Sequence, residues 1–127
     1  MKETSREEEA LRLLNISISR YPNNPEPLAI TSDILRRQGK LFDAKVYIEK
    51  AIIIKPNDAN FHFNLGIILI GLKILSKAVI ALNKALLLNP KFIEAHLNLC
   101  SVHISLCDLA EAERCGKKVI SLDPNCS

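Results

Sequence analysis

Tryptophan is absent from the sequence, other aromatic residues are scarce, and basic residues never form a long run. Aromatic residues make up 5% of the 127 residues, which is too few for the stacking platforms that hold single-stranded nucleic acids. The formal net charge is only +3, and at most two basic residues are adjacent, as at Arg36 and Arg37. Because proteins that bind nucleic acids concentrate basic residues on one face, we expect no nucleic acid among the partners.

Long apolar segments and export signals are also missing. The longest stretch without a charged residue, 59–72, has fourteen residues, whereas a helix needs about 20 apolar residues to span a bilayer. The first nine residues are rich in glutamate and contain no apolar core of a signal peptide. We therefore expect a cytoplasmic protein without membrane insertion, whose four cysteines are kept reduced.

Catalytic motifs are lacking as well. The sequence has neither a glycine-rich phosphate loop nor a Gly-x-Ser-x-Gly motif. Its three histidines have no carboxylate placed for a proton relay. We therefore predict that this chain is not an enzyme and needs no cofactor.

What the sequence does contain is a repeat of 34 residues. Apolar residues make up 48% of the chain, enough for the core of one domain. Four prolines recur at intervals of 34 residues, and each follows an alanine by twelve residues. These pairs are Ala10 with Pro22, Ala44 with Pro56, Ala78 with Pro90, and Ala112 with Pro124. A fixed period of this length is typical of solenoids, in which each unit packs on the next.

Each unit contains two stripes with the spacing of a helix face, the first at i, i+3, i+4, i+7 and the second at i, i+4, i+7, i+10. In the middle unit, the first stripe is His62, Leu65, Gly66 and Leu69, and the second is Ala78, Leu82, Ala85 and Leu88. The small residues Gly66 and Ala78 predict a close approach of the two helices. We predict an all-α fold with seven helices, the first starting at a capping box of Ser5 and Glu8. Their ranges are 5–20, 25–37, 41–54, 59–71, 75–88, 93–105 and 109–121.

The middle unit resembles the tetratricopeptide repeat, whose pattern is an aromatic residue, Leu-Gly, Tyr, Ala-x3-Phe and Pro. The matching residues are His62, Leu65, Gly66, Leu69, Ala78, Leu82 and Pro90. The resemblance implies a right-handed superhelical α-solenoid of antiparallel helix pairs with about 3.5 repeats. The chain would then consist of a half repeat at 1–24, formed by a second helix only, and of repeats at 25–58, 59–92 and 93–126. Ends without capping repeats suit either a piece of a longer array or a short protein that forms homo-oligomers through them.

In this family, the first helix of each repeat lines a concave groove, so the resemblance implies a peptide-binding site on those helices. The implied residues are Asn60, Phe63, Asn64, Ile67, Leu97, Asn98, Ser101 and Ile104. Both 62–66 and 96–100 read His-x-Asn-Leu-small, which is similar to repeats of O-linked N-acetylglucosamine transferase, where an asparagine ladder holds peptide backbone. The carboxylate clamp of chaperone-binding members is not matched, because the acidic residues Asp33 and Glu94 stand where donors are needed.

Histidine and cysteine cluster in the third repeat as His-x3-Cys-x2-His-x3-Cys, with His96, Cys100, His103 and Cys107. These four side chains share a helix face, which superficially suits zinc. The pattern extends about 16–20 Å along a helix, however, which is too long for one tetrahedral site. Three of its residues also coincide with the packing stripe. We therefore predict no metal site and four free thiols.

The leading functional hypothesis is a non-catalytic scaffold that binds a protein through an extended, partly apolar peptide or partner segment in the groove. Two alternatives stay open. One is the N-terminal substrate-presenting arm of a larger enzyme of the glycosyltransferase or sulfotransferase type. The other is a structural oligomerisation unit.

Overall fold

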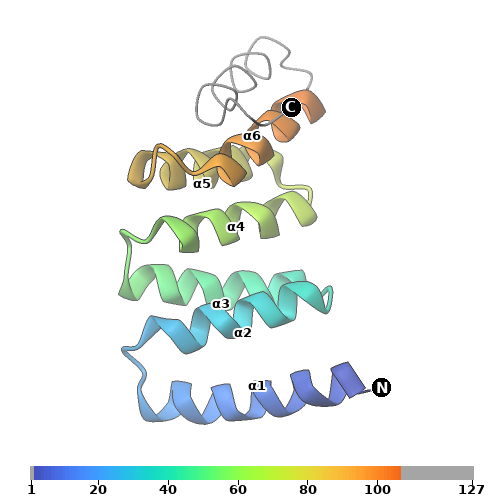
Figure 1. The fold of residues 1–127 in the computed structure, drawn as a ribbon, viewed down its shortest axis with the longest axis vertical. Coiled ribbons are helices and arrows are strands. Elements are labelled where there is room, and N and C mark those ends of the chain that lie inside the picture. Colours follow the sequence, from blue (N-terminus) through green and yellow to red (C-terminus); the bar gives the residue numbers. More distant parts are fainter. Residues whose placement is uncertain (1, 107–127) are drawn as a thin grey trace. The chain divides into compact units, whose positions relative to one another are not determined.

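The computed structural model describes residues 2–106, which form six helices joined by short turns (Figure 1). The helices are α1 (Lys2–Arg20), α2 (Pro25–Arg37), α3 (Leu41–Ile54), α4 (Ala59–Gly71), α5 (Leu75–Leu88) and α6 (Ile93–Ser105). The all-α prediction is confirmed for this part of the chain, and the predicted ranges of α2 to α6 coincide with the observed ones. The helix predicted at 109–121 lies outside the described residues. Along 2–106, no helix is long and apolar enough to cross a membrane.

The start of α1 differs from the prediction. The helix begins at Lys2 rather than at residue 5, so Ser5 lies within the helix and does not start it. The physical reason is that residues 2–4 contain neither proline nor glycine, so nothing local stops the helix from extending toward the N-terminus.

Side-chain caps start the first helix of each hairpin. The Asn24 side chain accepts a hydrogen bond from the Glu26 backbone N–H at 3.2 Å, and Pro25 occupies the first helical position. The Asp58 side chain accepts bonds from the backbone N–H groups of the second and third residues of α4, at 2.9 and 3.4 Å. These bonds satisfy donors that have no partner within the helix, and so they fix where α2 and α4 begin.

The turns inside the two hairpins use one backbone geometry. Gly39, between α2 and α3, has a φ of 81°, and Lys73, at the equivalent place between α4 and α5, has a φ of 64°. In both turns the next backbone N–H donates to the first helix of the hairpin, from Lys40 to Leu35 and from Ile74 to Leu69, each at 2.9 Å. A left-handed residue after a helix is a common way to end it, and glycine adopts this conformation with least strain.

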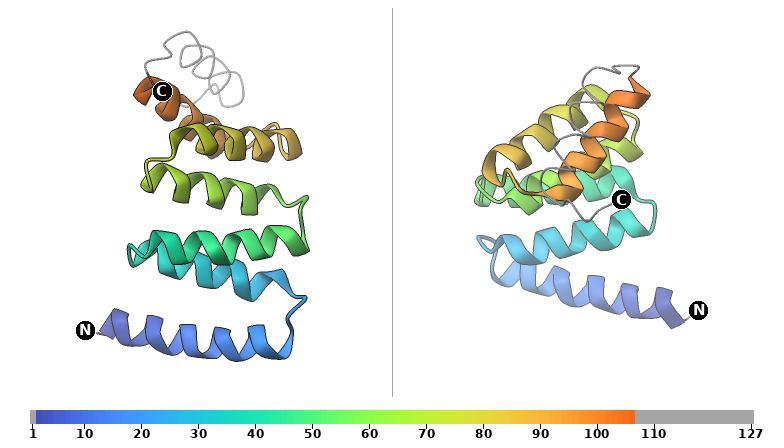
Figure 2. Two further views of the ribbon diagram at one scale, coloured as in Figure 1. Left: turned by 180° about the vertical axis from the view of Figure 1, so that it is seen from behind. Right: turned by 45° about the horizontal axis from the view of Figure 1, so that its top comes forward.

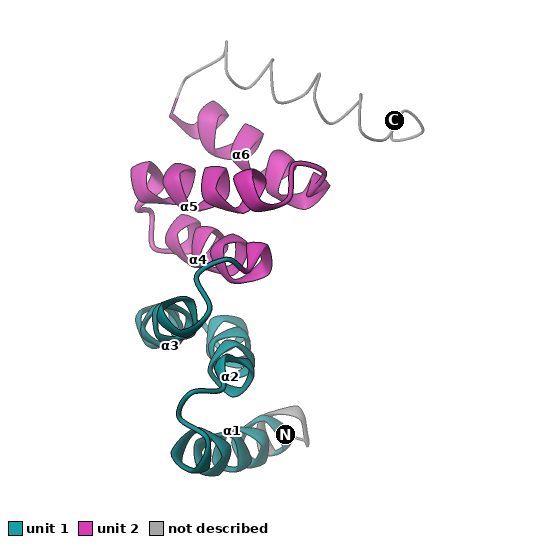
Figure 3. Cartoon of the chain, turned by 90° about the vertical axis from the view of Figure 1, so that its left-hand side faces the viewer, with its two compact units in different colours: residues 1–57 teal, residues 58–127 magenta. Residues whose placement is uncertain are grey.

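The chain divides into two compact units, which Figure 3 shows in different colours: unit 1 is residues 1–57 and unit 2 is residues 58–127. In unit 1, α2 and α3 form an antiparallel hairpin and α1 packs against α2. In unit 2, α4 and α5 form the equivalent hairpin, while α6 packs against α5 and touches α4. Both hairpins can be followed in the two views of Figure 2.

Close approach of the paired helices is confirmed at Gly66. A Cβ atom on Gly66 would lie 2.8 Å from Leu82 Cδ2 and 3.7 Å from the Ala78 carbonyl oxygen. Ala78 itself is completely buried, as its place in the repeat predicts. A side chain at residue 66 would therefore force the buried Leu82 side chain to shift.

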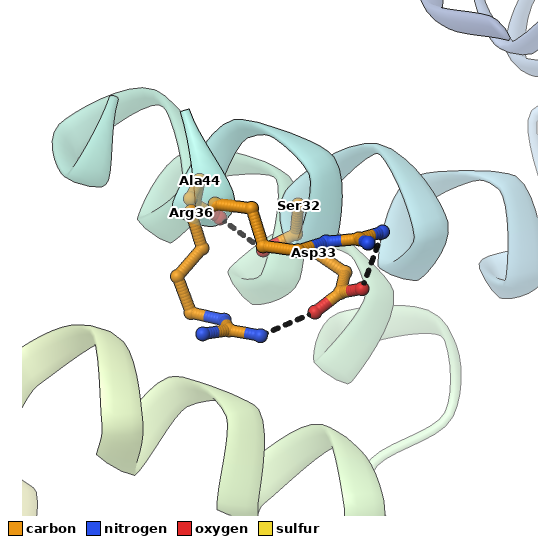
Figure 4. A network of polar contacts seen from close by, with 5 residues as sticks. Ser32, Asp33, Arg36 and Ala44 are labelled. Atoms are coloured by element: carbon orange, nitrogen blue, oxygen red, sulfur yellow. Dashed lines mark hydrogen bonds and ion pairs between the residues drawn. The ribbon is translucent and has the colours of Figure 1, made fainter. Parts of the chain in front are cut away.

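A hydrogen bond joins the helices at the equivalent place in unit 1. Ser32 is one repeat before Gly66, and Ala44 is one repeat before Ala78. The buried Ser32 hydroxyl donates to the Ala44 carbonyl at 2.7 Å (Figure 4). The sequence pattern did not predict this bond, although a buried hydroxyl requires such a partner.

Candidate peptide-binding surface

The eight residues implied as a peptide-binding site lie on α4 and α6 of unit 2. Three of the four residues on α6 follow an i, i+4, i+7 spacing and so share one side of that helix: Leu97, Ser101 and Ile104. All three are exposed, with 49% of Leu97 and 58% of Ile104 accessible to solvent. We call these three residues the α6 strip. It offers two apolar side chains with a small hydroxyl between them, and it carries no charge.

The corresponding side of α4 is more enclosed. Asn60 is exposed, whereas Asn64 and Ile67, one and two turns further along, are half-buried. Ile67 packs against the hydrophobic core of unit 2, so only part of this side chain reaches the surface. The whole of α4 contains no Asp, Glu, Lys or Arg. The surface that α4 adds beside α6 is therefore uncharged and rich in amide groups.

Phe63 does not belong to the exposed surface, which corrects the prediction for this residue. Its side chain is 9% exposed and lies in the core cluster with Leu82 and Leu99. Its ring centroid is 4.6 Å from that of Phe92, which stands just before α6. The ring is buried because Phe92 and α6 cover this side of α4. Helix periodicity cannot reveal that contact, since it depends on how the next helix packs.

The two asparagines of the implied ladder differ in their surroundings. The Asn98 side-chain amide donates to the Glu94 carbonyl at 2.9 Å, a bond within its own helix. The Asn64 side chain makes no such bond to any described residue, and it lies half-buried beside Ile67. Asn64 therefore has its donors and its acceptor available to a ligand, whereas one donor of Asn98 is already engaged.

A charged cluster occupies the equivalent first helix of unit 1. Asp33 on α2 lies between two arginines, with its carboxylate oxygens 2.6 Å from Arg36 Nη2 and 3.1 Å from Arg37 Nη2 (Figure 4). The exposed residue Ile30 precedes this cluster by one turn. The sequence was used only to identify Asp33 as unsuited to a carboxylate clamp; its pairing with Arg36 and Arg37 was not predicted, although the i+3 and i+4 spacings indicate it.

The histidines and cysteines that raised the possibility of zinc are partly accounted for. His96 is buried, and its Nε2–H donates to the Pro90 carbonyl at 2.9 Å, so it fixes the turn before α6. Cys100 is a half-buried free thiol beside the core of unit 2. Cys107, Cys115 and Cys126 lie outside the described residues. Within 2–106, no three His, Cys, Asp or Glu side chains gather around a point that a metal ion could occupy.

Comparison with known proteins identifies the repeat. The profile of the tetratricopeptide repeat family matches residues 59–92. A comparison with curated protein sequences found no match.

Solved structures share the fold at identities below 25%. The crystal structure of MamA has a TM-score of 0.90 and 24% identity, covering 97% of this chain and 72% of MamA. YrrB, described as a tetratricopeptide-repeat protein with an unusual peptide-binding site, has a TM-score of 0.86 and 17% identity, covering 97% of this chain and 63% of YrrB. The first tetratricopeptide-repeat domain of Spaghetti (RPAP3), bound to the HSP90 peptide SRMEEVD, has a TM-score of 0.77 and 24% identity. The match covers 80% of this chain and 81% of that domain.

Proposed function

Because residues 59–92 are a tetratricopeptide repeat within an array of that fold, we propose that the chain is a non-catalytic module that binds an extended, partly apolar peptide. The α6 strip is the observation that carries the proposal. Leu97 and Ile104 expose about half of their side chains on a first helix, the class of helix that the family uses for recognition. Structural neighbours that bind peptides, such as YrrB and the RPAP3 domain, support this function.

The chemistry of the surface favours a peptide with apolar side chains and few acidic ones. The α6 strip provides two apolar contacts about 10 Å apart, the rise over seven helical residues. Asn64 adds an amide that can donate to and accept from peptide backbone. The carboxylate of Glu94 borders the strip, and neither α4 nor α6 contains a lysine or an arginine. A peptide as acidic as SRMEEVD would therefore meet the like charge of Glu94 without a lysine or an arginine on these helices to compensate it.

None of the solved structures described above is an O-linked N-acetylglucosamine transferase. We accordingly restrict the asparagine-ladder proposal to Asn64, whose amide is available, and expect Asn98 to contribute less. Asn64→Ala should weaken a bound peptide by about 0.5–1.5 kcal/mol, the net value of one hydrogen bond. Asn98→Ala should weaken it by a smaller amount.

The test uses peptides selected on the whole chain from a random library displayed on phage. Leu97→Asp and Ile104→Asp should each weaken a selected peptide by about tenfold or more, since each places a charge in an apolar contact. Leu87→Asp is the matched control, because Leu87 is also exposed and apolar but lies on α5, a second helix. Circular dichroism should confirm that each variant keeps its helix content. Equal affinity for the wild type and both α6 variants would contradict the proposal.

A further inference from the structure

The exposed side of α1 carries a row of four residues, Glu9, Leu13, Ile16 and Arg20, which we call the α1 stripe. The spacings are four, three and four residues, so all four side chains lie on one side of the helix. Leu13 is 58% exposed and Ile16 53%, and both charged residues are exposed as well. The residues of α1 that are half-buried, such as Leu14 and Ile18, lie on another side. Two adjacent apolar residues thus face solvent between an acidic and a basic end.

The same positions look different in a complete hairpin. Two repeats further along the chain, on α5, the equivalent residues are Lys77, Ala81, Lys84 and Leu88. Ala81 is only 5% exposed, because it lies in the core that α4 and α5 share. On α1, the residue at this position is the exposed Leu13, and an isoleucine replaces the lysine that follows. Within unit 1, α1 contacts only α2 among the described helices, and the stripe is left uncovered.

Along the stripe, two apolar residues lie between an acidic residue at one end and a basic residue at the other. Reversing the direction of the helix leaves the apolar residues in the middle and exchanges the acidic and basic ends. An antiparallel helix with the same stripe would therefore place Leu13 opposite Ile16 twice and Glu9 opposite Arg20 twice. A two-fold axis produces this arrangement, because it brings one patch of a molecule onto the identical patch of a second copy. We propose that α1 pairs antiparallel with α1 of a second copy of this chain through the α1 stripe. This inference is independent of peptide binding, since the first helices are not involved.

The surface next to the stripe is slightly hollowed rather than flat. A shallow hollow of about 540 Å³ is lined by Arg12, Asn15, Ile16, Ser19 and Arg20. In the antiparallel register, Leu13 of the second copy lies over Ile16 and enters this hollow, and Glu9 of the second copy reaches Arg20. Within one chain, Glu9 Oε1 lies 4.0 Å from Arg12 Nη2, and both side chains are largely exposed. Such a surface pair contributes little, so it does not prevent Glu9 from turning to the second copy.

The size of the stripe sets the strength of the pairing. From Glu9 to Arg20 the helix rises about 16 Å, so one helix pair forms the contact. A contact of this size is at the lower end of specific interfaces. We therefore expect a reversible dimer with a Kd on the order of 10–100 μM. The two ion pairs lie at the edges of the contact, so the Kd should rise with salt concentration.

The test is sedimentation equilibrium of the whole chain over a range of concentrations at low salt. Glu9→Arg and Arg20→Glu should each raise the Kd by about tenfold or more, because each creates two like-charge pairs in the symmetric dimer. The double variant Glu9→Arg/Arg20→Glu should regain the wild-type Kd. Mixing the two single variants should give a heterodimer, since each end then meets an opposite charge. Leu13→Glu should abolish the dimer.

Asp43→Arg is the matched control, because Asp43 occupies the position of Glu9 on α3 and is also exposed. It should leave the Kd unchanged, and circular dichroism should show the same helix content in every variant. A chain that stays monomeric at all concentrations would overturn the proposal. So would a dimer that persists in Leu13→Glu, or single variants that dissociate but fail to pair when mixed, because each result removes the two-fold contact between α1 stripes.

Discussion

At the scale of single residues, the repeat tolerates different solutions at equivalent positions. Gly39 and Lys73 occupy the same place in their hairpins, and both have a left-handed backbone. Glycine adopts this conformation freely, whereas the Cβ atom of lysine strains it. A Cβ atom on Gly39 would meet nothing within 4 Å. Glycine is therefore favoured at residue 39 by its backbone conformation and not by a lack of space.

Lys73→Gly should stabilise the protein by about 0.5–1 kcal/mol, because it removes this strain. The midpoint of urea unfolding, followed by circular dichroism, measures the effect. Lys84→Gly is the control: Lys84 is exposed in the middle of α5, where glycine should cost about 1 kcal/mol instead. If both variants were destabilised alike, the left-handed geometry at residue 73 would be wrong.

At the scale of the helices, the 34-residue repeat made the bounds of α2 to α6 predictable. Side-chain caps at Asn24 and Asp58 mark the starts of α2 and α4, but the predicted ranges of α3, α5 and α6 also agree with the structure although these helices have no such cap. The start of α1 has no such signal, and its prediction was three residues too late. Contacts between helices were harder to predict. The burial of Phe63 depends on Phe92, which lies 29 residues away in the sequence.

The contact between paired helices gives a prediction at this scale. Ala78→Leu should destabilise the protein by about 1–3 kcal/mol, because Ala78 is completely buried where α4 and α5 approach each other. Thermal unfolding of the variant measures this loss. Ile80→Leu serves as the control, since Ile80 is largely exposed on the same helix, and it should leave the melting temperature nearly unchanged. A melting temperature of Ala78→Leu equal to that of the wild type would contradict the tight packing.

At the scale of the whole molecule, the packing contacts are local. Each unit has its own hairpin, and each hairpin has its own buried residues. In repeat proteins built from neighbouring contacts, stability is close to a sum of local terms. The prediction of the peptide-binding residues was also limited to what a single helix and the family resemblance can indicate. The family resemblance implied the residues on α6 that the structure exposes, whereas the burial of Phe63 depends on packing by the next helix, which the sequence pattern does not contain.

Ile48→Ala tests how local the stability is. Ile48 is completely buried in unit 1, and its truncation should cost about 2–5 kcal/mol. Hydrogen exchange should show faster exchange of the amides of α2 and α3, with those of α4 and α5 nearly unchanged. An equal loss of protection in both units would mean that the chain unfolds as a single cooperative block.

The absence of tryptophan and the place of the two tyrosines have a practical consequence. Tyr21 and Tyr47 are the only tyrosines of the chain, and both belong to unit 1. The tyrosine emission of the protein therefore comes from unit 1, whereas far-ultraviolet dichroism reports the helices of both units. Recording the two optical signals in one denaturant titration separates the unfolding of unit 1 from that of the rest without any label. The natural chain thus carries a built-in reporter for one half of its own repeat array.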